Sequence, residues 1–271
     1  MQTLNKPIVD FHVHAFPDHV APSALDALYS AYRMMPVTDG TISGLLSMME
    51  RDKVSYAVIM PVATKASQVR GINDWAAAQT DPRLIVFGGI HPDFEDAAAE
   101  VDRIISLGLA GIKIQANWQG AYVDDPRMYP IYEAAQGRLI VMFHAGDEHT
   151  KFDPLRATPD RLAKVRVDFG QLTMVAAHMG GYRMWDEVDE HLIGKDVYMD
   201  ISACFPHELP DERLLDMIRR HGADKILFAT DMPLAEPGKE IARLAQIGLD
   251  DDELEAILWG NAKRLLGERL R

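Results

Sequence analysis

The sequence predicts a single domain with the (β/α)₈ (TIM) barrel fold, and three observations support this prediction. The 271-residue chain contains eight short apolar runs that are rich in β-branched residues. Amphipathic segments with helical spacing lie between several of these runs, which is the alternation of βα units around a parallel sheet. Polar residues suited to chemistry fall at or near the ends of five runs, where barrel enzymes carry their sites.

The expected strands follow one another along the whole chain. They are Ile8–His14, Ser55–Met60, Leu84–Ile90, Gly111–Gln115, Leu139–His144, Thr173–His178, Val197–Ile201 and Ile226–Thr230. Helices are expected at Glu95–Ser106, Pro159–Phe169 and Glu208–Arg220. The longest connection, residues 15–53, carries helix-like pieces and is a candidate lid. A doubly wound open sheet also alternates strands and helices, but it would scatter the polar strand-end residues, so the barrel is preferred.

Composition restricts the partner and the compartment. A formal net charge of −13 argues against a nucleic acid or an anionic membrane surface and favours a small-molecule substrate. The single cysteine, Cys204, excludes an intrachain disulfide and a cysteine-rich zinc site, which fits a reducing cytosol. The apolar run before Asp10 is too short for a signal peptide or a membrane span, so we expect a cytoplasmic protein.

The sharpest local feature is Asp10-Phe11-His12-Val13-His14, in which one residue separates two imidazoles on an apolar strand. Side chains at positions i and i+2 of a strand face the same side, so His12 and His14 are both expected to point into the barrel mouth. Two neighbouring imidazoles suit a divalent cation. The alternative is a pair of hydrogen-bonded core histidines, which leaves the other strand-end residues unexplained.

Two more histidines end consecutive apolar runs. His144 closes the run Leu139–Phe143, His178 closes the run Thr173–Ala177, and a glycine-containing break follows each. These breaks would leave both rings exposed at the rim. Either histidine alone fits a structural role equally well, but their repetition on consecutive strands favours one constellation with the first pair.

Two charged residues also accompany apolar strands. Asp231 follows Ile226–Thr230, where a carboxylate needs a metal, a cation or hydrogen-bond donors; the alternative is an N-cap for the next helix. Lys113 lies inside the strand Gly111–Gln115. It would pair with Asp10 or Asp231, hold a substrate carboxylate, or bridge two metals if carboxylated, and a structural ion pair is equally supported.

In this order, the residues resemble the amidohydrolase superfamily, specifically its amidohydrolase-related branch, which includes aminocarboxymuconate semialdehyde decarboxylase. The resemblance covers nearly the whole chain, including the C-terminal Gly260–Gly267. It implies one divalent ion, zinc first and manganese as the alternative, on His12, His14, His144 and Asp231. His178 would lie beside the bound water or on a second ion.

The resemblance also implies roles for residues outside that ligand set. Two-metal relatives use a carboxylated lysine on the fourth strand, a role that Lys113 would fill. Deoxyribonuclease-like relatives carry a glutamate there, which this sequence lacks. From the chemistry of their side chains and their places in or near the ends of strands, and not from the resemblance, substrate contacts are expected from Lys113, Trp118 and Arg183. Asp10, His91, Asn117, His149 and Trp185 are neighbouring candidates, and the alternative for Trp118, Arg183 and these neighbours is an ordinary surface or rim position. A homodimer is expected, because the branch is commonly oligomeric and two-fold pairing is the commonest closed symmetry.

Three function classes follow from this site. The first is a hydrolase of a small amide, ester or lactone, in which the ion lowers the pKa of bound water to about 7, Asp231 takes its proton and His178 stabilises the developing oxyanion. The second is a non-oxidative decarboxylase or hydratase of an unsaturated or aromatic acid, built from the same parts. The third is a barrel without catalytic activity, which the complete ligand set argues against.

Overall fold

The structure is a computed structural model that describes residues 6–270. The contacts of these residues group into two compact units, each assembled from segments that lie far apart in the sequence. The first unit comprises residues 6–59, 82–85 and 200–270, and the second comprises residues 60–81 and 86–199. The expectation of one domain over residues 1–271 stays a prediction.

The first unit begins with a parallel pair of strands, in which Val9 lies opposite Tyr56 and Val13 lies opposite Ile59. Its strands are β1 (Val9–Val13), β2 (Tyr56–Ile59), β3 (Leu84–Val86, whose last residue belongs to the second unit) and β9 (Ile226–Leu227). Its helices are α1 (Ala21–Tyr32), α2 (Ile42–Asp52), α9 (Asp211–His221), α10 (Pro237–Leu244), α11 (Asp251–Glu255) and α12 (Asn261–Leu266).

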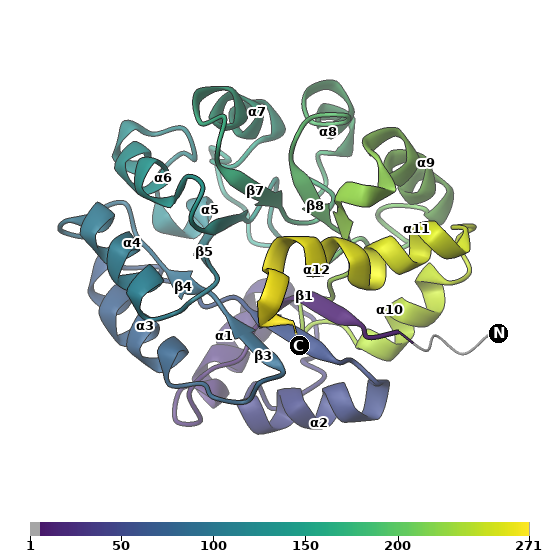
Figure 1. The fold of residues 1–271 in the computed structure, drawn as a ribbon, viewed down its shortest axis with the longest axis horizontal. Coiled ribbons are helices and arrows are strands. Elements are labelled where there is room, and N and C mark those ends of the chain that lie inside the picture. The colour runs from purple at the N-terminus through teal and green to yellow at the C-terminus, as the bar shows by residue number, and fades with distance from the viewer. Residues whose placement is uncertain (1–5, 271) are drawn as a thin grey trace. The chain divides into compact units, whose positions relative to one another are not determined.

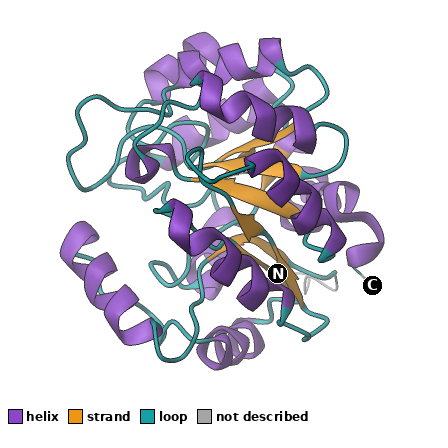
Figure 2. Ribbon diagram, turned by 90° about the vertical axis from the view of Figure 1, so that its left-hand side faces the viewer, coloured by secondary structure: helices purple, strands orange, loops and turns teal. Residues whose placement is uncertain are grey.

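The second unit contains a parallel sheet whose strands follow in sequence order (Figure 1). These strands are β4 (Gly88–Gly89), β5 (Gly111–Ile114), β6 (Ile140–Phe143), β7 (Thr173–Ala176) and β8 (Tyr198–Asp200, whose last residue belongs to the first unit). The helices of this unit are α3 (Val69–Ala77), which precedes β3, and α4 (Ala97–Ser106), α5 (Ala116–Gln119), α6 (Tyr129–Ala135), α7 (Pro159–Asp168) and α8 (Trp185–His191), which connect the strands β4 to β8. Helices flank the strands, as Figure 2 shows.

The strand and helix predictions agree with these elements to within a few residues, with one correction. The run Leu84–Ile90 is not one strand, because the extended structure breaks at Phe87. Beyond the break, Gly88 and Gly89 pair with Ile112 and Lys113 of β5. A Cβ at Gly88 would lie 2.9 Å from the Ile104 side chain of α4, so the missing side chain allows the close approach of that helix.

Several helices bury one face, as their apolar spacing predicts. In α9 the buried apolar residues are Leu214, Met217 and Ile218, at the i, i+3, i+4 spacing of an amphipathic helix. At the start of α2 the Thr41 side chain accepts a hydrogen bond from the Gly44 amide at 3.0 Å, which caps the helix. Burial and capping together therefore explain where these helices begin and which side faces inward.

The long connection of residues 15–53 carries α1 and α2, as its predicted helix-like pieces indicate. Its start is joined to the segment between α1 and α2 by a hydrogen bond from the Phe16 amide to the Gly40 carbonyl at 2.8 Å. Within this connection Tyr29 and Met35 are exposed. Its role as a lid stays a prediction.

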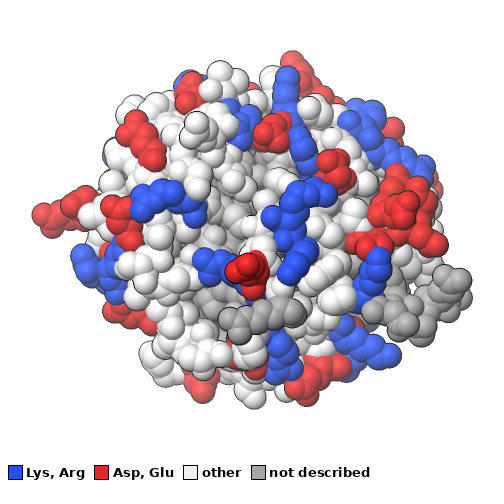
Figure 3. Space-filling model, in the orientation of Figure 1, with Lys and Arg blue, Asp and Glu red and all other residues white. Residues whose placement is uncertain are grey.

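The surface carries both signs of charge. Basic and acidic side chains are interspersed over the face drawn in Figure 3. Examples are the pairs of Arg127 with Asp93 and of Arg138 with Asp102. Across residues 6–270, no helix has the length and apolar character needed to cross a membrane.

The C-terminal helix α12 is fastened to the start of β9 by one buried side chain. The Asn261 amide nitrogen donates to the carbonyls of Ala223 and Ile226, each at 2.7 Å. Asn261 is fully buried, so these two carbonyls would lose their donors in a dry environment if the side chain were removed. This contact gives a structural reason for the asparagine in the C-terminal motif.

We predict that Asn261→Ala lowers the free energy of unfolding by about 1–3 kcal/mol, because two buried acceptors lose their donor. Urea denaturation followed by circular dichroism measures the change. The control is Gln246→Ala, an exposed amide that should alter stability by less than about 0.5 kcal/mol. Equal midpoints for the two variants would contradict a structural role for Asn261.

Candidate metal centre

The backbone of the first unit brings three ligand-type residues together. His12 and His14 lie on or directly after β1, and Asp231 lies in the segment after β9. The Asp231 amide donates to the His12 carbonyl at 2.9 Å, and the His14 amide donates to the Met232 carbonyl at 2.6 Å. Asp231 has a φ of +58°, a left-handed conformation that is uncommon for a non-glycine residue and often marks functional sites.

One oxygen of Asp231 faces both imidazoles of this group. Its Oδ1 lies 3.1 Å from His14 Nε2 and 3.6 Å from His12 Nε2. In a tetrahedral site with metal–ligand bonds of 2.0–2.1 Å, two ligand atoms are separated by about 3.3 Å. The two observed distances bracket that value, and the three ligand atoms all lie within 4.8 Å of one another. The donor set therefore fits a divalent cation such as zinc.

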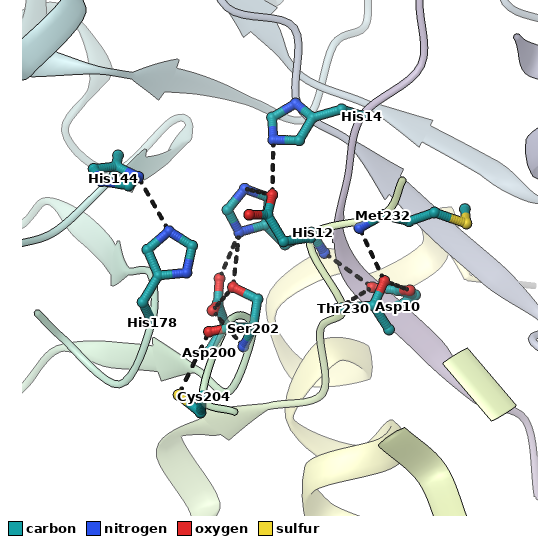
Figure 4. A network of polar contacts seen from close by, with 11 residues as sticks. Asp10, His12, His14, His144, His178, Asp200, Ser202, Cys204, Thr230 and Met232 are labelled. Atoms are coloured by element: carbon teal, nitrogen blue, oxygen red, sulfur yellow. Dashed lines mark hydrogen bonds and ion pairs between the residues drawn. The ribbon is translucent and has the colours of Figure 1, made fainter. Parts of the chain in front are cut away.

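A buried carboxylate that sequence reasoning missed orients His12. Asp200 Oδ2 lies 2.9 Å from His12 Nδ1 and Ser202 Oγ lies 3.3 Å from the same nitrogen, as Figure 4 shows. The other oxygen of Asp200 accepts hydrogen bonds from the backbone amide and the hydroxyl of Ser202. An Nδ1–H that points at Asp200 leaves the lone pair on Nε2, the nitrogen that faces Asp231. Such carboxylate–histidine pairs fix the tautomer and orientation of metal ligands.

Asp10 is a second fully buried carboxylate of the first unit. It accepts hydrogen bonds from the Thr230 hydroxyl at 2.6 Å, the Thr230 amide at 3.1 Å and the His12 amide at 3.3 Å. Burial raises the pKa of Asp10 to about 7, against the opposing effect of the hydrogen bonds from Thr230 and His12. The bonds to Thr230 join β1 to the residue before Asp231, so Asp10 helps to hold His12 and Asp231 in position without facing the candidate metal site.

The two other predicted site histidines meet in the second unit. His178 Nε2 lies 3.0 Å from His144 Nδ1, and the rings are edge to face with centroids 4.7 Å apart (Figure 4). His144 Nε2 donates to the Asp147 carbonyl at 3.1 Å, and Glu148 Oε1 lies 3.0 Å from the same nitrogen. With the proton assigned to Nε2 by these contacts, Nδ1 of His144 carries the lone pair and accepts from His178. The Asp147 carbonyl is thus the hydrogen-bond acceptor that orients His144, and Glu148 adds a negative charge beside the same nitrogen.

The loops that hold these histidines are packed against each other through the backbone. The Tyr182 amide donates to the Ala145 carbonyl, and the Asp147 amide donates to the Tyr182 carbonyl, each at 2.9 Å. A Cβ at Gly146 would lie 2.4 Å from the Tyr182 nitrogen, so only glycine fits between the loops. His178 has a φ of +60°, so it shares the left-handed conformation of Asp231.

The three predicted substrate contacts all lie in the second unit, in different settings. Lys113 is buried on β5, Trp118 is exposed on α5 with its ring 5.2 Å from that of Phe152, and Arg183 lies over the ring of Tyr182. Whether they bind substrate stays a prediction.

Four neighbouring candidates have mainly structural contacts in the same unit. Asn117 binds the Gly146 carbonyl and the Arg156 amide, and the Trp185 indole donates to the His178 carbonyl. His91 Nδ1 accepts from the Asp93 amide, and burial lowers the pKa of His91. His149 Nε2 lies 2.7 Å from the Tyr182 hydroxyl, so these two side chains form a hydrogen-bonded pair.

The helix-cap alternative for Asp231 is wrong. The next helix, α10, begins at Pro237 after the N-cap Glu236, well beyond Asp231. Sequence reasoning also passed over Asp200 and Glu148. Asp200 carried a usable signal, because it is an acid near the end of the apolar run Val197–Ile201, as Asp231 is near the end of its own run.

Comparisons with known proteins place these features in a family. The chain matches a solved decarboxylase structure, 5-carboxyvanillate decarboxylase from Sphingomonas paucimobilis, with 17% identity, a TM-score of 0.70 and coverage of 96% of this chain and 98% of the other. It matches an uncharacterised TIM-barrel protein from Bordetella bronchiseptica with 19% identity, a TM-score of 0.75 and coverage of 98% and 100%. It also matches a dihydroxybenzoic acid decarboxylase from Polaromonas, whose structure contains manganese and the inhibitor 2-nitroresorcinol. The identity is 18%, the TM-score is 0.69, and the match covers 96% of this chain and 97% of the other. A search of curated proteins found no match.

The fold is that of a TIM barrel, and the histidine–carboxylate group is a candidate metal site. The predicted (β/α)₈ fold is confirmed by these structural likenesses. Residues 9–267 match the family model described as Amidohydrolase, so the chain belongs to this amidohydrolase family. The family resemblance predicted from His12, His14, His144 and Asp231 is thereby confirmed.

We predict a graded loss of metal binding from changes in the first unit. His12→Ala and His14→Ala remove a ligand and should abolish tight binding of zinc, whereas Asp200→Asn should weaken it about 10- to 100-fold, because the imidazole loses its charged partner. Competition with a chromogenic chelator measures the affinity, and circular dichroism checks the fold. His207→Ala, an exposed histidine of the same unit, is the control. Unchanged affinity in Asp200→Asn would contradict its orienting role.

Proposed function

We propose that this chain is a metal-dependent hydrolase that acts on a small amide, ester or lactone. The observation that carries the proposal is the single Asp231 oxygen that faces His12 and His14 at 3.6 and 3.1 Å, beside an imidazole oriented by Asp200. These side chains are nitrogen and oxygen donors of the kind that hold zinc or manganese. His144 is proposed as the fourth ligand from its strand-end position and the family resemblance.

The proposed ligands divide the work among them. When bound, a divalent cation polarises a substrate carbonyl and makes a coordinated water more acidic. Asp231 has two carboxylate oxygens, so one can hold the cation while the other accepts a proton from water and returns it to the leaving group. Asp200 keeps His12, and the Asp147 carbonyl with Glu148 keeps His144, in the tautomer whose other ring nitrogen has a lone pair. To hold the cation, His144 Nδ1 would have to give up the hydrogen bond that it accepts from His178.

His178 is proposed to act on the substrate rather than on the cation. Its Nε2–H donates to His144 Nδ1 in this structure. If His144 Nδ1 held the cation instead, that N–H would be released and could donate to an oxygen that gains negative charge. Lys113 and Arg183 are cations of the second unit that would attract a carboxylate-bearing substrate, and the exposed Trp118 offers a flat apolar surface for a planar group. One ion is proposed, and carboxylation of Lys113 would add a second.

A non-oxidative decarboxylase is the second candidate. It is favoured by the likeness to 5-carboxyvanillate decarboxylase and dihydroxybenzoic acid decarboxylase, which have the same fold. In that reaction the site would hold a carboxylate and a neighbouring oxygen, and an acid such as His178 would protonate the carbon that loses carbon dioxide. A small-molecule substrate and a homodimer in the cytoplasm complete the proposal.

We predict that the zinc- or manganese-loaded protein turns over a member of a panel of small lactones, amides, esters and aromatic acids, and that removal of metal by a chelator abolishes the activity. Acid release from a lactone, ester or amide supports the hydrolase, and carbon dioxide release from an aromatic acid supports the decarboxylase. Added metal should restore the rate. Turnover that persists in metal-free protein would refute both candidates.

We predict that Asp231→Asn folds and still binds metal, but loses at least about 10²- to 10⁴-fold in kcat, the usual contribution of a general base. The amide keeps the shape and one neutral oxygen but lacks the charge that accepts a proton. Asp211→Asn, an acid at the start of α9 in the same unit, is the control. Activity within a few-fold of the parent would remove Asp231 from proton transfer.

A further inference from the structure

A buried glutamine of the second unit has an amide oxygen that the protein itself does not satisfy. Gln115 follows β5 directly and is 8% exposed. Among the described residues, its Oε1 is buried and has no hydrogen-bond partner. A buried acceptor in this state costs free energy, so native proteins keep few of them, and those that remain call for an explanation.

The strand register places Gln115 beside a proposed metal ligand. In the parallel pair of β5 and β6, Lys113 lies opposite Met142 and Ile114 lies opposite Phe143. One residue further along both segments, Gln115 aligns with His144, and the His144 amide donates to the Ile114 carbonyl at 2.9 Å. Strand alternation puts Gln115 on the same side as Lys113. Gln115 therefore lies at the carboxyl end of the strand, where barrels carry their chemistry.

A second glutamine holds the backbone of Gln115 in place. Gln119 Oε1 accepts from the Gln115 amide at 3.1 Å, and Gln119 Nε2 donates to the carbonyls of Ala63 and Ile90 at 2.9 and 2.6 Å. Two buried glutamines four residues apart thus differ in one respect. The side-chain oxygen and nitrogen of Gln119 both form hydrogen bonds within the protein. The backbone of Gln115 is held by one of these bonds, but its side-chain oxygen accepts no hydrogen bond from the described residues.

We propose that Gln115 Oε1 accepts a hydrogen bond from the substrate, and that the substrate carries an N–H or O–H donor next to the group that reacts. This inference rests on the proposed function and narrows it, because an amide, an amine or a hydroxylated acid offers such a donor and a simple ester or lactone does not. A site built to bond a donor rejects analogues without it strongly, since the buried acceptor is then left unpaired. Gln115 is therefore a specificity-determining residue.

The first test needs no substrate and compares Gln115→Met with Gln119→Met by thermal unfolding of the metal-loaded protein. Methionine has a similar volume and no amide. Gln115→Met should raise the Tm by about 1–4 °C because it removes an unsatisfied buried acceptor, whereas Gln119→Met should lower the Tm because three hydrogen bonds are lost. An unchanged or lower Tm in Gln115→Met would mean that the protein or a resident water uses the oxygen, and would overturn the proposal.

The second test measures donor recognition with small metal-binding probes. The wild type should bind acetohydroxamate about 10-fold or more tightly than N-methylacetohydroxamate, which lacks the N–H, and Gln115→Met should bind the two within about 3-fold of each other. Isothermal titration calorimetry gives both affinities. Equal affinities in the wild type, or none for either probe, overturn the ligand assignment. Failure of metal loading would refute the proposed function instead, and the Tm comparison would still decide the role of Gln115.

Discussion

The candidate centre depends on one backbone pairing, between β1 and the segment that follows β9. The bonds from Asp231 to His12 and from His14 to Met232 fix two distant stretches of chain in register. Because side chains alternate along a strand, that register places both imidazoles opposite the same carboxylate. The buried hydrogen bonds between Asp10 and Thr230 fix the same register just before these residues. A shift of the register by one residue would break these bonds and point both histidines away from Asp231.

Backbone strain supports the same interpretation in both units. Asp231 and His178 each adopt a positive φ in the segment that follows a strand, although neither is a glycine. A left-handed residue at a strand end turns its side chain away from the course that strand alternation would give it. Such conformations persist where the surrounding structure over-determines them, and they cluster at sites of binding and chemistry. At His178 the Trp185 indole donates to the carbonyl, and at Asp231 the amide donates to the His12 carbonyl while the Asp231 carbonyl accepts from the Leu234 amide.

The sequence is informative wherever the signal is local. The alternation in Asp10–His14 predicts that both histidines face one side, and the polar breaks after apolar runs predict His144, His178 and Asp231 at strand ends. Contacts between distant residues leave no such signal: Asp200 orients His12 across 188 positions. The break in Leu84–Ile90 could not be predicted for a related reason. The run stays apolar throughout, and the close approach of Gly88 to Ile104 involves a helix that comes later in the chain.

The three acids around the first-unit histidines differ in the hydrogen bonds that their oxygens accept, and this difference distinguishes a structural role from a catalytic one. Asp10 accepts three hydrogen bonds from Thr230 and His12, and Asp200 accepts from His12 and from both donors of Ser202. Both are fully buried, and donors of this number offset the cost of burying a carboxylate. Asp231 is partly exposed, and its Oδ1 faces imidazole nitrogens that suit a cation. A cation at that position would balance the negative charge of the group, and it would leave Asp231 as the acid that can exchange a proton with a substrate or with water.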